Sequence, residues 1–451
     1  MTPRNAAASP SCWEPRVSGM RLFRFGGKVF TPQLFETFFQ AGFECSSHRR
    51  RDGKRVDVIA ATEHDRAAAA DYRQLAALKL RTARDGLRWH LIERSPGQYD
   101  WSSFLPMLKA ARDLDIQVIW DLLHYGWPDH IEPWRREFID RFAAFAAASA
   151  RLIRSETDAA PWFCPINEIS FLSWAGGDKG YINPFGKGRG AEFKNQLVRA
   201  SLAAIDAIRH VEKRARFIQA EPAIHIVADP ARPRDRKAAE ASRLSQFEAW
   251  EMLTGNLAPE LGGSPDHLDV VGVNYYWNNQ WIHRGLTLIQ GDPLYRPFRH
   301  ILQEIHHRYK RALFIAETGR EGDQRALWLR FIAEEVRAAF SAGVPVEGIC
   351  IYPIIDYPGW DNERHCPCGL LGAAQPLSTR PVYEPLAAEL RRQQAIFHSL
   401  FGEPRGRNLA GRVDTGRRTP NCQAQTTVAF EGLVDTDNAP DTQADTRTGA
   451  D

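Results

Sequence analysis

Short apolar runs alternate with longer amphipathic stretches along most of this chain. The apolar runs are bounded by turn-forming residues, as is typical of buried strands, and they cover residues 41–45, 80–89, 116–124, 162–168, 216–222, 268–276, 312–317 and 348–355. The longer stretches repeat apolar residues at the i, i+3, i+4 spacing of helices that face a core, for example over 65–80, 102–115, 137–156, 192–213 and 325–343. Eight strands interleaved with helices predict one parallel sheet.

Closure of that sheet into a barrel fits the sequence better than an open, doubly wound sheet. No glycine-rich phosphate-binding turn follows the first strand. Polar residues gather instead at the carboxyl ends of many different strands, where (β/α)8 barrels carry their chemistry. We therefore expect an α/β fold, a single (β/α)8 TIM barrel over residues 20–401. The polar segment 1–19 is expected to be a flexible arm, and segment 402–451, which lacks apolar periodicity, a disordered tail.

Composition and charge limit the classes of partner that we expect this protein to bind. Hydrophobic residues make up 43% of the chain and charged residues 25%, as in ordinary globular proteins. The net charge of +3 is too close to neutral to indicate nucleic acid or a membrane surface as partner, and no apolar run reaches the length of a membrane span. No secretory signal opens the chain, and the seven cysteines are scattered without a disulfide pattern. We expect a cytoplasmic protein, and its oligomeric state stays open.

Two glutamates stand at the ends of predicted strands. Glu168 ends the fourth strand and Glu317 the seventh, so both should point into the mouth of the barrel. Glycoside hydrolysis requires two carboxyl groups beside the scissile bond, one neutral and able to donate a proton, the other charged. Either glutamate alone is explained equally well as a solvent-facing residue at a strand end. The neighbouring residues must therefore decide between a catalytic pair and two surface glutamates.

Those neighbours resemble glycoside hydrolase family 1 and the wider clan A of retaining (β/α)8 glycosidases, over about residues 38–362. Asn167-Glu168 looks like the Asn-Glu pair that carries the acid/base on strand four. The segment IAETG around Glu317 is similar to the family's I-T-E-N-G context of the nucleophile. The resemblance implies a retaining β-glycoside hydrolase that acts on a carbohydrate or glycoside substrate without a cofactor, with Glu168 as acid/base and Glu317 as nucleophile.

Four further stretches match motifs of the family in the same order along the chain: ARDGLRW, LLHYGWP, GVNYY and the stretch that ends in Trp360. By this resemblance Arg84 hydrogen-bonds the nucleophile and keeps it ionised, since a nearby guanidinium lowers a carboxylate pKa. His124 then bonds a hydroxyl of the sugar, and Tyr276 contacts the nucleophile from strand six. Together with Asn167, these residues form the substrate-binding set that the resemblance implies.

The positions with which family 1 holds its non-reducing sugar are changed in this sequence. The family's glutamate near the last strand falls at Gly359, its strand-one glutamine near His48 and Arg49, and its strand-eight tryptophan at Tyr352. Arg49 and its basic neighbours are candidates to face an anionic sugar, such as a uronic acid or a sugar phosphate. The alternative is that this basic run is a solvated loop.

The loop after the fourth strand carries two aromatic residues beside the acid/base. Trp174 and Tyr181 are candidates to stack on the leaving-group sugar, although core packing explains such aromatics equally well. Glu221 ends the fifth strand, where it could contact substrate or pair with an arginine. The segment HCPC at 365–368 suggests metal, but no second pair of ligands completes a tetrahedral site, so we expect no metal.

Two alternatives keep the same barrel. A transglycosidase would pass the glycosyl group to a sugar acceptor, and sequence does not separate it from a hydrolase because the first half-reaction is shared. A non-catalytic carbohydrate-binding barrel is favoured by the changed sugar-holding positions. The retention of Arg84, Glu168, Tyr276 and Glu317 argues against it.

Overall fold

The computed structural model describes residues 24–25, 28–29, 31–373 and 379–401. The predicted arm at 1–19 and the predicted tail at 402–451 lie outside these residues. The chain divides into two units, Met1–Pro404 and Arg405–Asp451, and all described residues belong to the first.

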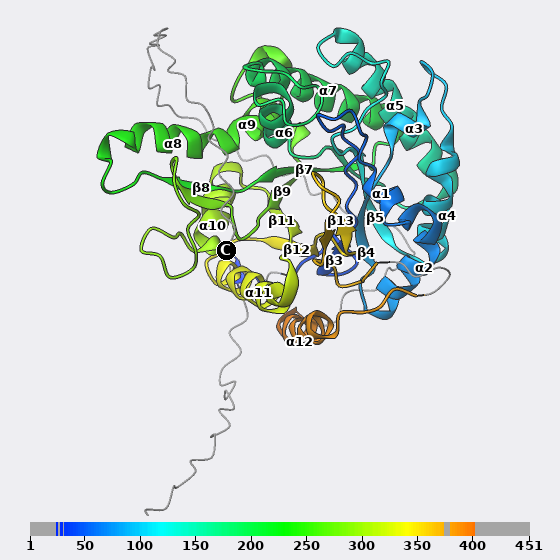
Figure 1. Cartoon of the computed structure of the whole chain (residues 1–451). Coiled ribbons are helices and arrows are strands. Elements are labelled where there is room, and N and C mark those ends of the chain that lie inside the picture. The colour runs from blue at the N-terminus through cyan, green and yellow to red at the C-terminus, as the bar shows by residue number, and fades with distance from the viewer. Residues whose placement is uncertain (1–23, 26–27, 30, 374–378, 402–451) are drawn as a thin grey trace, which may run out of the picture. The chain divides into compact units, whose positions relative to one another are not determined.

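Eight parallel strands close into a barrel, which confirms the predicted fold class (Figure 1). Each strand falls within or beside one of the predicted apolar runs. In barrel order, starting from the strand nearest the amino terminus, they are β3 (Phe39–Gly42), β4 (Thr82–Gly86), β5 (Gln117–Leu123), β6 (Trp162–Ile166), β7 (Arg216–Pro222), β9 (Val270–Asn274), β11 (Ala312–Thr318) and β12 (Val346–Ile351), which pairs with β3.

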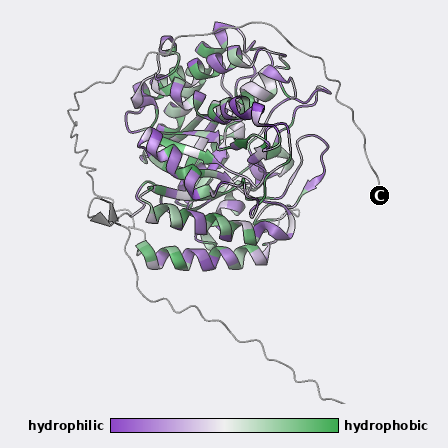
Figure 2. Ribbon diagram, turned by 90° about the vertical axis from the view of Figure 1, so that its left-hand side faces the viewer, coloured by the Kyte–Doolittle hydropathy of each residue, from purple (hydrophilic) through white to green (hydrophobic). Residues whose placement is uncertain are grey.

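Helices surround the barrel on its outside (Figure 1). They are α1 (Val58–Ala61), α2 (His64–Ala77), α3 (Trp89–Ile92), α4 (Leu105–Asp113), α5 (Arg136–Glu156), α6 (Ile169–Leu172), α7 (Gly190–Val211), α8 (Arg236–Leu244), α9 (Glu248–Thr254), α10 (Phe298–Tyr309), α11 (Arg325–Ser341) and α12 (Glu384–Phe401). The long helices carry both hydrophobic and hydrophilic residues along their length (Figure 2), as their predicted amphipathic spacing requires. Among the described residues, no helix is both long enough and apolar enough to cross a membrane.

Short strands lie outside the barrel. They pair as β1 (Arg24–Phe25) with β2 (Lys28–Val29), β8 (His225–Val227) with β10 (Gln280–Ile282), and β13 (Tyr357–Pro358) with β14 (His365–Cys366).

The core has two layers because successive side chains of a strand point to opposite faces. The outer layer packs strands against helices. The inner layer fills the barrel with residues such as Ile119, Trp162 and Phe314. The ring of Phe35 packs against the rings of Trp162 and Phe314, with a centroid distance of 4.9 Å to each. The barrel is therefore solid below its mouth, and polar chemistry is confined to the carboxyl ends of the strands.

A buried ionic cluster ties α2 to the barrel. The His64 ring lies 2.7 Å from Asp71 through Nδ1 and 2.8 Å from Asp85 through Nε2, and Arg380 donates to Asp71 at 2.6 Å. Burial acts to lower the pKa of His64, but the carboxylates of Asp85 and Asp71 outweigh it and raise that pKa to about 9. The imidazole is therefore charged in the folded protein at neutral pH.

This cluster predicts a pH-dependent stability. A histidine whose folded pKa is raised from 6.5 to about 9 stabilises the fold fully below pH 6.5, and that contribution disappears as pH rises through 9. The free energy of unfolding, measured by denaturant titration, should fall by about 3 kcal/mol more across this range in the wild type than in His64→Gln. The exposed histidine variant His398→Gln should keep the wild-type slope. Equal slopes for wild type and His64→Gln would contradict the prediction.

Candidate active site

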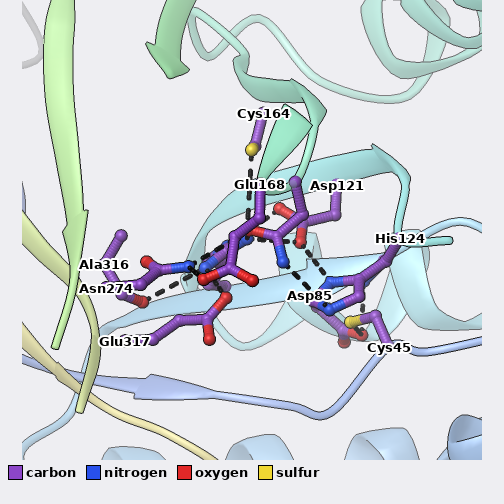
Figure 3. A network of polar contacts seen from close by, with 12 residues as sticks. Cys45, Asp85, Asp121, His124, Cys164, Glu168, Asn274, Ala316 and Glu317 are labelled. Atoms are coloured by element: carbon purple, nitrogen blue, oxygen red, sulfur yellow. Dashed lines mark hydrogen bonds and ion pairs between the residues drawn. The ribbon is translucent and has the colours of Figure 1, made fainter. Parts of the chain in front are cut away.

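Two glutamates face each other at the mouth of the barrel (Figure 3). Glu317 is the penultimate residue of β11, and Glu168 begins the turn from β6 into α6. Glu168 adopts a left-handed backbone conformation with φ of 47°, and its amide donates to the carbonyl of Ala220 at 3.0 Å. Such a conformation is costly for a residue with a side chain, so its presence marks a position that the surrounding structure holds in place.

Glu317 is surrounded by donors suited to a charged carboxylate. Its Oε1 accepts from the Arg84 guanidinium at 2.8 Å, and its Oε2 accepts from the Tyr276 hydroxyl at 2.9 Å. Arg84 is fully buried and also bonds both oxygens of Asp121, at 2.9 and 2.8 Å. A buried guanidinium in this position stabilises the ionised carboxylate that a nucleophile needs.

Glu168 has neutral hydrogen-bond partners. Asn274 Nδ2 donates to its Oε1 at 2.9 Å, and the Tyr125 hydroxyl donates to its Oε2 at 2.8 Å. Burial, followed by the negative charge of Glu317, raises the pKa of Glu168 to about 8. One carboxyl group is thus kept protonated at neutral pH beside another that is paired with a cation, which is the division of labour between an acid and a nucleophile.

A chain of hydrogen bonds links the pair to His124. Arg84 donates to Asn167 Oδ1 at 2.6 Å, so that the amide nitrogen of Asn167 lies 3.1 Å from Nε2 of His124. Nδ1 of His124 lies 2.9 Å from Asp121. Burial acts to lower the pKa of His124 and the hydrogen bond to Asp121 raises it, with a net upward shift, whereas the donor from Asn167 favours the neutral ring. His124 is therefore fixed in orientation, with Asp121 at Nδ1 and Asn167 at Nε2.

The other predicted site residues lie at the rim. The Trp360 ring is 5.6 Å from Tyr125, and Trp174 lies 5.5 Å from Tyr181 at 45% and 50% exposure. Both Trp174 and Trp360 contact Phe171, at ring distances of 6.0 and 6.1 Å. An aromatic surface therefore runs from Tyr125, which bonds Glu168, outward along the loop after β6.

Arg49 is not brought into this network. Its Nε donates to Asp129 at 2.8 Å, a second nitrogen of the guanidinium contacts the same carboxylate, and the third donates to the carbonyl of Gly53. Glu221 accepts from the backbone amide of Ser170 at 3.0 Å, and its burial raises its pKa to about 7. It adds negative charge behind Glu168 and pairs with no arginine among the contacts described for it.

The sequence interpretation missed several polar residues of the site, namely Glu44, Asp121, Tyr125 and Asn274. Asp121 and Glu44 each interrupt an apolar run, at 116–124 and 41–45, and a charged residue inside a buried strand was the available signal. Asn274 and Tyr125 lie inside motifs that were recognised, but nothing local in sequence indicates that both of their side chains contact Glu168.

Cys45, Asp121 and His124 have ligand atoms close enough together to hold a metal ion. Both oxygens of Asp121 are already bonded to Arg84, however, and a cation there would meet that guanidinium. Burial raises the pKa of the Cys45 thiol well above its ordinary value, so the thiolate that binds metal is disfavoured. We assign no metal to these residues.

Comparison with known proteins places the fold. No family model matches the sequence, and no curated protein matches it. A β-glucosidase from Thermotoga maritima in complex with glucoimidazole superposes with a TM-score of 0.65 at 15% identity, covering 80% of this chain and 99% of that one. The family 1 β-glucosidase of the same organism superposes with a TM-score of 0.66 at 13% sequence identity, and the match covers 81% of this chain and 99% of that one. The AHE enzyme from Alicyclobacillus herbarius superposes with a TM-score of 0.66 at 15% sequence identity, and the match covers 80% of this chain and 98% of that one. The fold is thus similar to that of family 1 β-glucosidases.

The contacts of Glu168 predict a measurable coupling between the two glutamates. Glu317→Gln removes a neighbouring negative charge, so the pKa of Glu168 should fall from about 8 toward its ordinary value, while burial keeps it above 4.5. Titration of glutamate side chains carrying a ¹³C label, followed by NMR, measures this shift. Glu363→Gln, at an exposed rim position, should leave the pKa of Glu168 unchanged. An unchanged value in Glu317→Gln would contradict the coupling.

Proposed function

We propose that this protein is a retaining β-glycoside hydrolase, with Glu317 as nucleophile and Glu168 as acid/base. The observation that carries the proposal is the opposite environment of the two facing carboxyl groups. Glu317 is held by the Arg84 guanidinium and the Tyr276 hydroxyl, whereas Glu168 is bonded by neutral donors and has a raised pKa. That pairing is what double displacement requires.

In the first half-reaction, Glu317 attacks the anomeric carbon as the bond to the leaving oxygen breaks. Glu168 gives its proton to that oxygen, so the leaving group departs as a neutral alcohol. A covalent bond then joins the sugar to Glu317, and Glu168 is left as a carboxylate. The negative charge of Glu317 is consumed in this bond, which removes the charge that raised the pKa of Glu168.

In the second half-reaction, the Glu168 carboxylate accepts a proton from water. The water oxygen attacks the anomeric carbon, and the bond to Glu317 breaks. Both glutamates return to their initial protonation states, and the sugar leaves with its original anomeric configuration. Arg84 and Tyr276 bond Glu317 in the free enzyme and stabilise the charge that returns to it as this bond breaks.

The residues around the pair support a sugar-binding role. Asn167 joins Arg84 to His124 and Tyr125, and Trp360 flanks Tyr125, which bonds Glu168. The exposed rings of Trp174 and Tyr181 give the leaving group an apolar platform. For Arg49, pairing with Asp129 favours the solvated-loop alternative over contact with substrate. Solved structures of similar fold include β-glucosidases, which supports a glycoside as substrate.

A mechanism-based label tests the proposal. A 2-deoxy-2-fluoro glycoside with a good leaving group should attach its sugar to Glu317, detected as a mass increase on the peptide that contains this residue. Glu168→Gln should lower kcat/KM by roughly 100- to 10,000-fold for substrates whose leaving group needs protonation. Arg391→Gln, which changes a charge on the outer helix α12, is the control and should react like wild type.

The alternatives give different results in the same assay. A transglycosidase would label at Glu317 but transfer the sugar to an added acceptor in preference to water. A carbohydrate-binding barrel without catalysis would show neither label nor turnover across a panel of fluorosugars, and this outcome would reject the proposed function.

The pH profile is a separate prediction. Glu168 must be protonated when the first half-reaction begins, and its pKa is raised to about 8. We therefore expect kcat/KM to be level below about pH 7, to reach half of that level near pH 8, and to approach a tenfold fall per pH unit at higher pH. In Glu168→Ala, assayed with a dinitrophenyl glycoside whose leaving group needs no proton, this alkaline decrease should disappear. Its persistence in the variant would assign the decrease to another group.

A further inference from the structure

Several buried polar atoms on one side of the barrel mouth have no partner in the part of the chain that the structure describes. They belong to Tyr352, whose hydroxyl is unbonded, to His48, whose two ring nitrogens are unbonded, and to Trp360, whose indole N–H is unbonded. Tyr352 is 1% exposed and His48 fully buried. A buried polar group without a partner destabilises the fold, so three such residues together indicate a ligand.

Glu44 lies among these residues. It comes two positions after the end of β3 and is 8% exposed. Its Oε1 accepts from the amide of Ser46 at 2.9 Å and lies 3.7 Å from Nε2 of His124. No hydrogen bond is described for its Oε2. One oxygen is therefore fixed by the protein, and the other has capacity for two further donors.

Tyr352 forms the adjoining wall. Its ring is parallel to that of His124, at 6.2 Å and 5°, and the charges that act most strongly on its hydroxyl are those of Glu44 and Glu317. Gly42 permits this placement, because a Cβ there would lie 2.1 Å from the Tyr352 ring. The ring is thus held between β3 and β12 with its hydroxyl near both carboxylates.

The charge of this wall is unfavourable for an anionic sugar. Among the residues described in contact with Glu44, Glu168 and Glu317, Arg84 is the permanently charged cation, and the nearby His124 ring already lies between Asp121 and Asn167. Arg84 is already shared between Glu317 and Asp121. The arginines whose charges act on His48 are also paired, Arg55 with Asp129 and Arg50 with Asp52 and Glu363. A second carboxylate brought in by substrate would therefore face Glu44 without a free cation among these residues to balance it.

We propose that Glu44, together with Tyr352 and His48, forms the subsite that binds the hydroxyl groups of a neutral sugar, and that Glu44 excludes sugars bearing a carboxylate. The two free sites on Glu44 Oε2 accept from neighbouring hydroxyls of the ring, Tyr352 contributes its unbonded hydroxyl, and His48 its unbonded nitrogens. This inference rests on the proposed function for the orientation of the sugar. It adds the residues that determine which sugar binds.

Binding of uncleavable substrate analogues tests this subsite without relying on catalysis. The probes are phenyl β-thioglycosides of glucose, galactose and mannose, each paired with its uronic acid counterpart, and affinity is measured by calorimetry. The wild type should bind one neutral member at least tenfold more tightly than its uronide. Glu44→Gln should weaken that neutral ligand about 10- to 100-fold and reduce its preference over the uronide at least tenfold.

Glu347→Gln is the matched control. Glu347 is also a buried carboxyl group, but it lies near the start of β12, at the opposite end of the barrel, where it accepts from the amides of Gln33 and Leu34. Its replacement should leave both affinities unchanged. A folded Glu44→Gln with wild-type affinities and an unchanged ratio would overturn the inference, as would a wild type that binds no member of the panel.

Tyr352→Phe covers the case in which Glu44→Gln does not fold. The hydroxyl it removes has no protein partner, so the unfolding midpoint should stay constant or rise. Affinity for the neutral thioglycoside should still fall about 2- to 10-fold. Unchanged affinity would mean that only water meets these groups and would overturn the role of Tyr352. If Glu44-dependent binding is found but no fluorosugar labels Glu317, the proposed function fails while this subsite stands.

Discussion

The site depends on one buried cation. Arg84 extends from β4 into the centre of the barrel, where its guanidinium bonds Asp121 on β5, Asn167 after β6 and Glu317 on β11. A buried charge is tolerated only when it is neutralised and its donors are satisfied, so these partners must stay where they are for the barrel mouth to be stable. The same contacts hold the carboxyl group of Glu317 in place and orient Asn167, which in turn orients His124. Stability and chemistry are therefore coupled through a single side chain.

The layered core explains why the two glutamates behave differently. Below the mouth, the barrel is filled with apolar side chains, so charges at the mouth are poorly screened. Each hydrogen bond or ion pair there therefore has a strong effect on the protonation of a neighbouring carboxyl group. Glu317 lies beside the guanidinium, whereas Glu168 lies beside a phenol and an amide. The two carboxyl groups therefore differ in charge environment, because Glu317 is bonded by a cation and the hydrogen-bond partners of Glu168 are neutral.

Sequence alone predicted the barrel because its signals are local: apolar runs, helical periodicity and polar strand ends. It also predicted the contacts of Arg84 and Tyr276 with Glu317, since these residues sit in recognisable motifs at the ends of identified strands. It could not predict partners joined only by the fold. Arg49 looked free in sequence, yet its carboxylate partner Asp129 lies 80 residues away. Glu44 was overlooked because nothing near it in the chain shows that His124 lies beside it.

The polar residues at the barrel mouth form two sets that differ in how many protein partners they have. Arg84, Asn167, Glu168, Tyr276 and Glu317 belong to a hydrogen-bonded network in which each replacement would leave a buried partner unsatisfied. Glu44 and Tyr352 follow β3 and β12, which are adjacent in the barrel and lie between β4, which carries Arg84, and β11, which carries Glu317. The Tyr352 hydroxyl has no hydrogen-bond partner among the described residues, so its removal disturbs the fold less than the replacement of a member of the network would.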